Sequence, residues 1–328
     1  DNYRQKIILI AGVRADDVEN SYAQAQAKLD EIEGLLVGSA RYEFAPLKLK
    51  EPLAPQFSTE EFCEKVETAK RHIFEGDIFQ VVPSNPRTAK AEGSLFDTYR
   101  VLRSQNPSPY MFYFTSDDVE IAGASPETLA RLQDGRLFTY PLAGTRPRGA
   151  TPEEDRAMEA DLLADEKERA EHDMLVDLGR NDLGRVSQLG SVKVEEYRNV
   201  LRFSRIMHIG STVIGQLAEG KDAVDVMDSI LPAGTLSGAP KLRACQIIQD
   251  LEGAKRGIYG GAIGYLDFTG NLDTCIGIRL VYKKNGRVCV QTGAGIVADS
   301  VPESEDRECY NKARAVMEAL RTAEGGLA

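Results

Sequence analysis

Hydrophobic positions follow a helical spacing in some segments of the chain and alternate or run together in others. Segment 21–36 carries apolar residues every three or four positions, which predicts an amphipathic helix. In segment 58–74 the same spacing follows Ser58, and Glu61 three residues later completes a capping box, so we expect a helix to begin there. Further helices are predicted at about 94–104, 152–178 (as two helices), 223–230, 239–251 and 302–321.

Short apolar runs and alternating segments predict strands between these helices. The first, KIILIAGV at 6–13, has the composition of a buried strand. Asp134-Gly135 separates two alternating segments, 128–133 and 136–139, and predicts a β-hairpin. Other strands are expected at 78–82, 110–114, 119–122, 192–200, 208–215, 258–267, 272–283 and 287–292.

The order of these elements predicts the fold class and the domain organisation. Strands and helices come in blocks and the last strands form a meander, which indicates an α+β fold and not a parallel doubly wound sheet. A proline-containing stretch at 44–57 is the only segment with the composition of a domain boundary. We therefore expect a strand–helix region at 1–50 and a larger, catalytic domain at 51–328.

Composition and charge narrow the class of protein. The 328 residues are 42% hydrophobic and 28% charged, which is typical of a globular chain with a large core. The net charge of −11 argues against nonspecific binding to nucleic acid or to an anionic membrane. The sequence has no apolar run long enough for a membrane span, and its five cysteines are scattered without a metal-binding or disulfide spacing. A cytoplasmic protein is therefore expected.

Two acidic segments have the spacing of metal ligands. Glu168 and Glu171 lie three residues apart in one predicted helix, and Glu305 and Glu308 repeat this spacing in the last. Residues three apart share a helix face, so each pair presents two carboxylates together. Mg²⁺ prefers such oxygen ligands and commonly takes one or two protein carboxylates. From the spacing alone, a solvated charged helix is the more common explanation.

Three glycine-rich segments suggest an anion site. Glycines let backbone N–H groups approach an anion closely, although ordinary turns have the same composition. None of the segments fits a P-loop or a dinucleotide-binding motif. Two of them carry Arg146, Arg148 and Lys241, which suggests a site for a carboxylate. The segments are 143–149, 234–241 and 292–295.

Two single residues are candidates for proton transfer. Glu127 directly follows an apolar strand, where a raised pKa would let its carboxyl group act as a general acid. A role at the start of a turn is the alternative. His208 lies in a predicted strand and is either a core residue or part of a site.

Five longer motifs together resemble the chorismate-utilising enzymes, and most of all their anthranilate synthase large subunits (component I). That family has two facing β-sheets flanked by helices, with the site between the sheets, which agrees with the α+β prediction. The motifs are PLAGTRPRG (141–149), LLADEKERAEHDMLVDLGRNDLGRV (162–186), LPAGTLSGAPK (231–241), RGIYGGAIGY (256–265) and GAGIVADSVPESE (293–305).

The resemblance implies a lyase reaction in tryptophan biosynthesis: chorismate and ammonia give anthranilate and pyruvate through 2-amino-2-deoxyisochorismate, with Mg²⁺. By the family pattern Glu171 and Glu308 would ligate Mg²⁺, with Glu168 and Glu305 nearby. Glu127 would protonate the departing C4 hydroxyl group. His208 would assist the elimination of pyruvate.

The resemblance also implies a set of substrate ligands. Arg279 and the amides of 293–295 suit carboxylate oxygens, because charge-assisted hydrogen bonds are the strong ones. Lys241 joins the set from the glycine-rich segments. The implied ligands are Gly144, Thr145, Thr235, Tyr259, Arg279, Gly293, Ala294 and Gly295.

Two positions distinguish reactions within the family. Relatives that add water have a lysine base where this chain has Gln80, and relatives that aminate C4 have a nucleophilic lysine where it has Ala143. Ammonia carries its own lone pair and needs no such base. Without the nucleophilic lysine, the covalent route to amination at C4 is closed. Both replacements therefore favour amination at C2. An aminodeoxyisochorismate synthase that stops before pyruvate loss shares these features, and an inactive truncated module is a further alternative.

The family pattern also implies an effector and a partner. Pro109, Tyr110 and Met111 resemble contacts of a tryptophan feedback site. The Leu-Leu-Glu-Ser motif of the family's N-terminal segment does not occur here, so we expect the chain to begin partway through the pattern and the feedback site to be affected. No Gly-Cys-Gly elbow is present, and ammonia is expected from a glutamine amidotransferase subunit in a hetero-oligomer.

Overall fold

The computed structural model describes residues 1, 3–38, 44–203 and 206–327. The chain divides into two compact units, Asp1–Phe44 and Ala45–Ala328. The first contains α1 (Val18–Val37), where a helix was predicted. The strand predicted at 6–13 is wrong, since these residues form no strand and Ile8 is 69% exposed. A strand needs a neighbouring strand to form hydrogen bonds with its backbone N–H and C=O groups, and the described residues of this unit contain no strand that could pair with 6–13.

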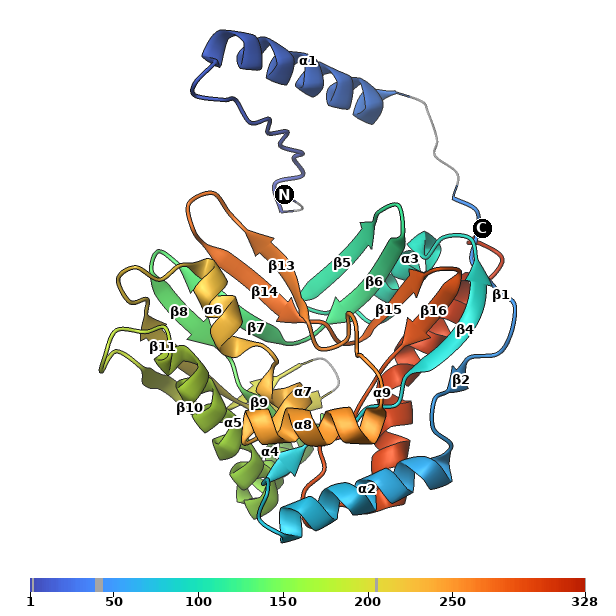
Figure 1. The fold of residues 1–328 in the computed structure, drawn as a ribbon, viewed down its shortest axis with the longest axis vertical. Coiled ribbons are helices and arrows are strands. Elements are labelled where there is room, and N and C mark those ends of the chain that lie inside the picture. The colour runs from blue at the N-terminus through green and yellow to red at the C-terminus, as the bar shows by residue number, and fades with distance from the viewer. Residues whose placement is uncertain (2, 39–43, 204–205, 328) are drawn as a thin grey trace. The chain divides into compact units, whose positions relative to one another are not determined.

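The described part of the second unit is built on two antiparallel sheets, each of seven strands (Figure 1). The first has the order β1 (Lys48–Leu49), β4 (Arg87–Glu92), β16 (Arg287–Val290), β15 (Leu280–Lys284), β6 (Val119–Ser125) and β5 (Tyr110–Thr115), with β2 (Ala54–Pro55) on β4. The second has the order β10 (Lys193–Arg202), β11 (Ile206–Gln216), β8 (Arg136–Thr139), β7 (Thr128–Gln133), β14 (Leu272–Ile276) and β13 (Ala262–Leu266), with β9 (Leu142–Pro147) on β11. A short pair, β3 (Gln80–Val81) and β12 (Gly238–Ala239), stands apart.

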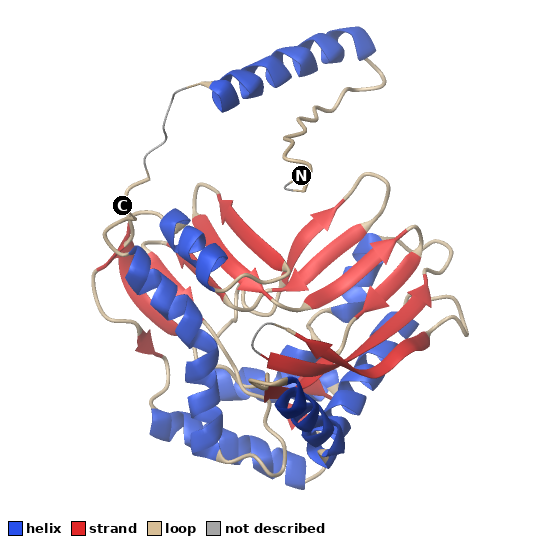
Figure 2. Cartoon of the chain, turned by 180° about the vertical axis from the view of Figure 1, so that it is seen from behind, coloured by secondary structure: helices blue, strands red, loops and turns tan. Residues whose placement is uncertain are grey.

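Helices pack along these sheets, and several gather on one side of them in Figures 1 and 2. The predicted α+β architecture of two sheets flanked by helices is confirmed. The helices of the second unit are α2 (Thr59–Phe74), α3 (Phe96–Gln105), α4 (Pro152–Ala164), α5 (Glu166–Gly184), α6 (Ala223–Ile230), α7 (Gly234–Ser237), α8 (Lys241–Glu252) and α9 (Pro302–Ala323).

Local signals set some helix ends where the sequence predicted them. The Ser58 hydroxyl accepts the Glu61 N–H at 3.2 Å, and the Glu61 carboxylate accepts the Ser58 N–H at 2.8 Å, which is the predicted capping box of α2. Asp165 lies between α4 and α5 and caps α5 by accepting the N–H groups of Lys167 and Glu168. This cap fixes the direction of the helix that carries two candidate metal ligands.

The single strand predicted at 272–283 is wrong, because the segment forms β14 in one sheet and β15 in the other. The chain turns between them, and Arg279 has a φ of +52° there. The turn places Arg279 where the two sheets meet. The strands β4 and β9 were not predicted. The start of β4 directly follows a proline, and β9 lies in a segment that was predicted to be a glycine-rich loop.

Separate apolar clusters hold the helices that bear the candidate site. Met317 and Leu320 of α9 pack with Val288 of the first sheet, while Val176 of α5 packs with Val213 of the second. Burying such a side chain contributes roughly 1.5–3 kcal/mol. Both helices are therefore held against their sheets by buried apolar contacts.

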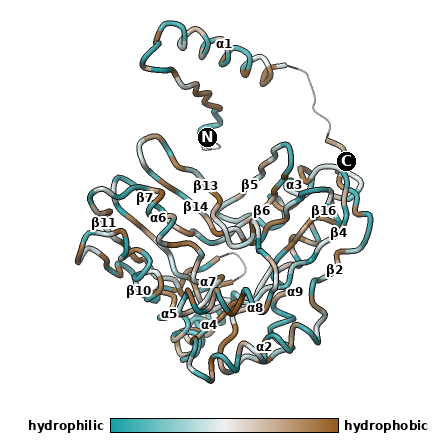
Figure 3. The backbone as a smooth tube through the Cα atoms, in the orientation of Figure 1, coloured by the Kyte–Doolittle hydropathy of each residue, from teal (hydrophilic) through white to brown (hydrophobic). Residues whose placement is uncertain are grey.

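Hydropathy varies along the backbone without a long apolar helix. Figure 3 shows hydrophilic and hydrophobic positions interleaved along the helices and strands. Within the described residues, every helix is too short or too polar to cross a lipid bilayer.

Candidate active site

The acidic pairs of α5 and α9 interact across space although they are remote in sequence. Burial raises the pKa of Glu171, and the neighbouring carboxylates of Glu168 and Glu308 raise it further. Burial also raises the pKa of Glu305, with Glu308 adding to the effect. The two helices therefore approach each other at Glu171 and Glu308, and each of these residues keeps its predicted partner, Glu168 or Glu305, beside it.

These four glutamates fit a hard cation. Only part of their charge is matched inside the chain: Glu308 lies 2.6 Å from the Lys312 ammonium and Glu168 lies 3.2 Å from Arg146. No three of the four have carboxylate oxygens within 4.8 Å of one another among the described residues. Mg²⁺ keeps several waters and takes few protein ligands, so two of these carboxylates would be enough to hold it.

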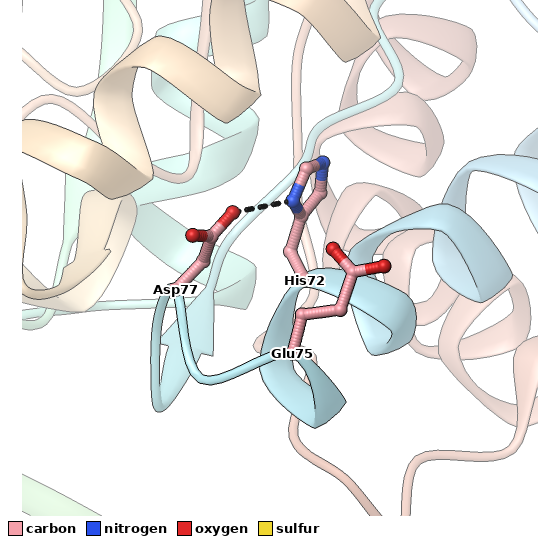
Figure 4. Close-up of side chains that lie close together, drawn as sticks. All are labelled: His72, Glu75 and Asp77. Carbon is pink, nitrogen blue, oxygen red and sulfur yellow. Dashed lines mark hydrogen bonds and ion pairs between the residues drawn. The ribbon is translucent and has the colours of Figure 1, made fainter.

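A tighter group of potential ligands lies elsewhere, at the end of α2 (Figure 4). His72, Glu75 and Asp77 place their ligand atoms within 4.8 Å of one another. The Asp77 carboxylate contacts His72 Nδ1 at 2.8 Å and the Arg243 guanidinium at 2.7 Å, and its pKa is lowered first by Arg243 and then by His72. The arginine supplies the positive charge that a metal would supply, so we assign this group to an ion-pair cluster.

Glu127 lies between β6 and β7, at the edge of the interior. Its carbonyl accepts the Ile276 N–H at 3.0 Å, which ties the residue to β14. Burial raises the pKa of its carboxyl group to about 7, while Thr235, Lys312 and Arg279 act in the opposite direction. Near neutral pH this group therefore exists in both protonation states, as a general acid requires.

His208 is held on β11 with a defined ring orientation. Its Nδ1 lies 2.8 Å from the carbonyl oxygen of Gly144 and 3.0 Å from the Thr145 hydroxyl. A carbonyl only accepts, so Nδ1 carries the proton in this arrangement and Nε2 keeps its lone pair. Gly144 has a φ of +70°, and a Cβ there would lie 3.2 Å from Glu168 Oε2. The glycine thus lets β9, which pairs with the histidine strand β11, approach the acidic helix α5 closely.

The glycine segment 293–295 lies against several other predicted site residues. A Cβ on Gly293 would lie 3.1 Å from the Tyr259 hydroxyl oxygen, and one on Gly295 would lie 2.7 Å from Gln80 Nε2. The Ala294 N–H already donates to the Pro83 carbonyl at 3.2 Å. A larger side chain at Gly295 would therefore have to displace Gln80, and one at Gly293 would also collide with the Pro83 carbonyl oxygen, 2.6 Å from its Cβ.

Two cations lie beside this glycine segment. Arg279 donates to the Lys312 carbonyl at 2.8 Å, and burial lowers the pKa of its guanidinium while Tyr259 and the acids Glu308 and Glu127 oppose that change. Lys312 donates from Nζ to the Gly293 carbonyl at 3.1 Å. Lys312 was missed by the sequence analysis, although it follows Glu308 by one helical turn, a spacing at which side chains meet.

The cations of the other two glycine-rich segments were expected to face a substrate carboxylate, but each is paired with acidic residues of the chain. Arg146 pairs with Asp161 at 2.6 Å, Asp165 at 2.8 Å and Glu168. Arg148 pairs with Asp155 at 2.7 Å. Lys241 pairs with Asp182 at 2.8 Å and donates to the Ile230 carbonyl at 2.7 Å. Their charges are neutralised within the chain, so the structure does not present Lys241 as a ligand for a substrate carboxylate.

Two cavities border these elements. A small one is lined by Glu127, Thr235 and Gly179 among others. A larger one, of about 470 Å³, lies between the β1–β2 segment and α9, and its lining includes Arg87 and Tyr310 but none of the predicted site residues. Of the predicted site residues, Glu127 and Thr235 line the small cavity, whereas the four glutamates, His208 and Arg279 line neither cavity.

Two of the predicted effector contacts, Tyr110 and Met111, begin the edge strand β5, and Pro109 directly precedes it. The Tyr110 hydroxyl donates to Asp273 at 2.8 Å and contacts Thr128 at 2.8 Å, which joins the two sheets. Met111 Sδ accepts the Ser108 N–H at 3.3 Å. A tryptophan contact at Pro109, Tyr110 and Met111 stays a prediction.

Comparisons with known proteins point to one family. The family described as chorismate binding enzyme matches residues 2–318. Anthranilate synthase component 1 of Acetivibrio thermocellus is 49% identical over 98% of this chain and 67% of its own length, and that of Aquifex aeolicus is 54% identical over 82% and 54%. The crystal structure of anthranilate synthase component I from Streptococcus pneumoniae superposes with a TM-score of 0.85 at 43% identity, covering 96% of this chain and 70% of that one.

Proposed function

The chain belongs to the family of chorismate binding enzymes, and from that membership we propose that it catalyses the anthranilate synthase reaction, which makes anthranilate and pyruvate from chorismate and ammonia. The chain spans 54–67% of the length of the two relatives named above. The observation that carries the proposal is that Glu308 on α9 lies near enough to Glu171 on α5 to help raise its pKa, and near enough to Arg279 to act on the pKa of that guanidinium.

We propose Glu171 and Glu308 as the protein ligands of one Mg²⁺, with Glu168 and Glu305 close by. When bound, the ion supplies positive charge for the ring carboxylate of chorismate. Arg279 and Lys312 add positive charge close to Glu308. An acidic chain needs such local cations before it can hold an anionic substrate.

In the first step ammonia adds at C2 and the C4 hydroxyl group departs. Glu127, with a pKa of about 7, donates the proton that the leaving hydroxyl group needs. Gln80 faces the same region: its Nε2 lies 3.5 Å from Glu171, and its buried Oε1 has no hydrogen-bond partner among the described residues. That oxygen can accept an N–H of ammonia, and an amide cannot act as a base for water.

In the second step pyruvate leaves and the ring becomes aromatic. We propose that His208 takes the proton from C2, because the Gly144 carbonyl fixes the hydrogen on Nδ1 and leaves Nε2 free to accept. Thr145 and the edge-on ring of Phe203, 5.7 Å away between centroids, hold the imidazole in place.

The name component 1 implies a second component for the relatives, and we propose that ammonia reaches this chain from a glutamine amidotransferase subunit. The direct test of the reaction avoids that partner. The chain is incubated with chorismate, ammonium and Mg²⁺, and anthranilate is followed by its fluorescence. Fluorescence that requires all three supports the proposal. An amino intermediate without fluorescence would instead identify an aminodeoxyisochorismate synthase, and no conversion would reject both.

Replacing His208 with methionine should slow pyruvate elimination more than amination, because methionine has no basic nitrogen at this place. Removing a general base typically costs about 10²–10⁴-fold in the step it serves. Rapid-quench chromatography should therefore show the amino intermediate accumulating. The variant His72→Met, at the end of α2, is the matched control and should behave like the wild type. Equal slowing of both steps would remove the proposed role of His208.

A further inference from the structure

A buried ion pair lies where several segments of the candidate site meet. Glu252 ends α8 and Arg256 follows it by four residues, with side chains 4% and 17% exposed. Arg256 Nε lies 2.9 Å from Glu252 Oε2 and Nη2 lies 2.5 Å from Oε1, so the pair is bidentate. This geometry fixes the plane of the guanidinium.

The remaining donors of Arg256 bind two other segments. Nη1 donates to the Leu236 carbonyl at 2.5 Å, and Nη2 donates to the Val82 carbonyl at 2.6 Å. Leu236 is next to Thr235, and Val82 directly follows β3, which carries Gln80. One side chain thus sets the distance between two segments that hold predicted substrate contacts.

A third segment lies on the face of the guanidinium. The Arg256 Cζ atom is 5.5 Å from the centroid of the Tyr259 ring, within the range of a cation–π contact. The Tyr259 ring is 4% exposed, and its hydroxyl group borders Gly293. The orientation of the ring against the glycine segment therefore depends on the same guanidinium.

Glu252 extends the network to the fourth segment. Its Oε1 accepts the Ser84 N–H at 2.8 Å and the Ser84 hydroxyl at 2.7 Å. Ser84 pairs as a β-bridge with Gly293, and its hydroxyl also accepts from Gln291 at 2.7 Å. The carboxylate thereby holds the chain around Ser84 against the glycine segment 293–295.

We infer that Arg256, oriented by Glu252, is a positioning residue that holds Thr235, Gln80, Tyr259 and the glycine segment 293–295 in the arrangement that binds chorismate. The inference rests on the proposed function for the identity of the ligand. Lysine cannot replace the arginine here, because an ammonium is a point charge and cannot serve a bidentate carboxylate and two carbonyls in one plane. Among the described residues, the hydrogen bonds of Arg256 and Glu252 reach neither α5 nor α9, which bear the proposed metal ligands; they connect to Glu171 only indirectly, through the long 3.5 Å contact of Gln80.

Because this network is separate from the proposed metal ligands, a positioning role predicts that substrate binding weakens while Mg²⁺ dependence does not change. An ion pair that only stabilises the fold predicts no such difference. In the full chain, Arg256→Lys should raise the KM for chorismate at least tenfold and lower kcat about tenfold. The Mg²⁺ concentration that gives half-maximal rate at saturating chorismate should stay within twofold of the wild type. The control is Arg243→Lys, which alters an arginine at the start of α8 that pairs with Asp77 at 2.7 Å on the surface. All of its constants should stay within twofold.

Two further variants keep the test decisive if the lysine variant folds poorly. Glu252→Gln retains an acceptor for Ser84 but loses the charge, and should raise the KM for chorismate several-fold. Arg256→Ala should regain activity with millimolar guanidinium chloride but not with methylammonium chloride at equal ionic strength. Chorismate constants within twofold of wild type in all three variants, or losses that follow the unfolded fraction without rescue, would overturn the inference. A wild-type chain that forms no anthranilate would contradict the proposed function instead.

Discussion

Replacing Glu308 with alanine is expected to remove Mg²⁺-dependent turnover, with kcat/KM for chorismate falling on the order of 10³-fold. Metal charge stabilisation is worth several kcal/mol, and about 1.4 kcal/mol corresponds to a tenfold change in rate. The variant also leaves the Lys312 ammonium, now 2.6 Å from Glu308, without this carboxylate. Steady-state rates of anthranilate formation across a Mg²⁺ titration measure the effect.

Glu303→Ala provides the matched control for this prediction. Glu303 is an exposed glutamate in the first turn of the same helix, so its removal changes the net charge equally and leaves the proposed ligands in place. Its rate and Mg²⁺ dependence should match the wild type. A near-normal rate and an unchanged Mg²⁺ dependence in the Glu308 variant would exclude Glu308 as a metal ligand.

Replacing Glu127 with glutamine should lower the rate of the amination step by about 10²–10⁴-fold, because an amide cannot donate an acidic proton to the departing hydroxyl group. The wild-type rate should also fall as the pH rises through about 7, the pKa of the Glu127 carboxyl group. The variant should lack that decline. Rates of chorismate consumption between pH 6 and 9 would measure both effects.

The same carboxyl group links folding stability to pH with a defined sign. Its pKa is raised from the ordinary value of 4.5 to about 7 in the folded chain, so the folded state binds this proton more tightly than the unfolded state does. The stabilising contribution is complete below about 4.5 and is lost as the pH rises through about 7. Urea unfolding should show this loss in the wild type and not in Glu127→Gln.

Glu195→Gln is the control for both measurements, because Glu195 is an exposed glutamate on β10 that pairs with Arg136 at 3.3 Å. It should keep the wild-type rate and pH profile. A Glu127 variant with a wild-type rate and an unchanged decline above pH 7 would assign the proton transfer to another group.

Local sequence signals predicted the elements that local contacts stabilise. The capping box at Ser58 set the start of α2 because both hydrogen bonds form within four residues. The strand predicted at 6–13 failed because its apolar pattern gives no information about a partner strand. Segment 272–283 is apolar in both β14 and β15, so the pattern did not reveal the turn at Arg279 that sends the chain from one sheet to the other.

The sequence likewise predicted some features of the candidate site and missed others. The i, i+3 spacing of Glu168 with Glu171, and of Glu305 with Glu308, is visible in the sequence, and the family motifs connect the two pairs. The ion pair of Lys241 with Asp182 is not visible, because the two partners lie far apart along the chain. Arg256 was also missed, since its partners at positions 82 and 236 meet it only in the folded chain.

The most direct measurement is a crystal structure of the chain with Mn²⁺ in place of Mg²⁺ and an unreactive chorismate analogue. Anomalous scattering should place one ion between the carboxylates of Glu171 and Glu308, with the ring carboxylate of the analogue bound to the same ion. An ion found only at His72, Glu75 and Asp77, or electron density that shows Glu171 and Glu308 facing separate solvent, would contradict the proposed metal site and the mechanism built on it.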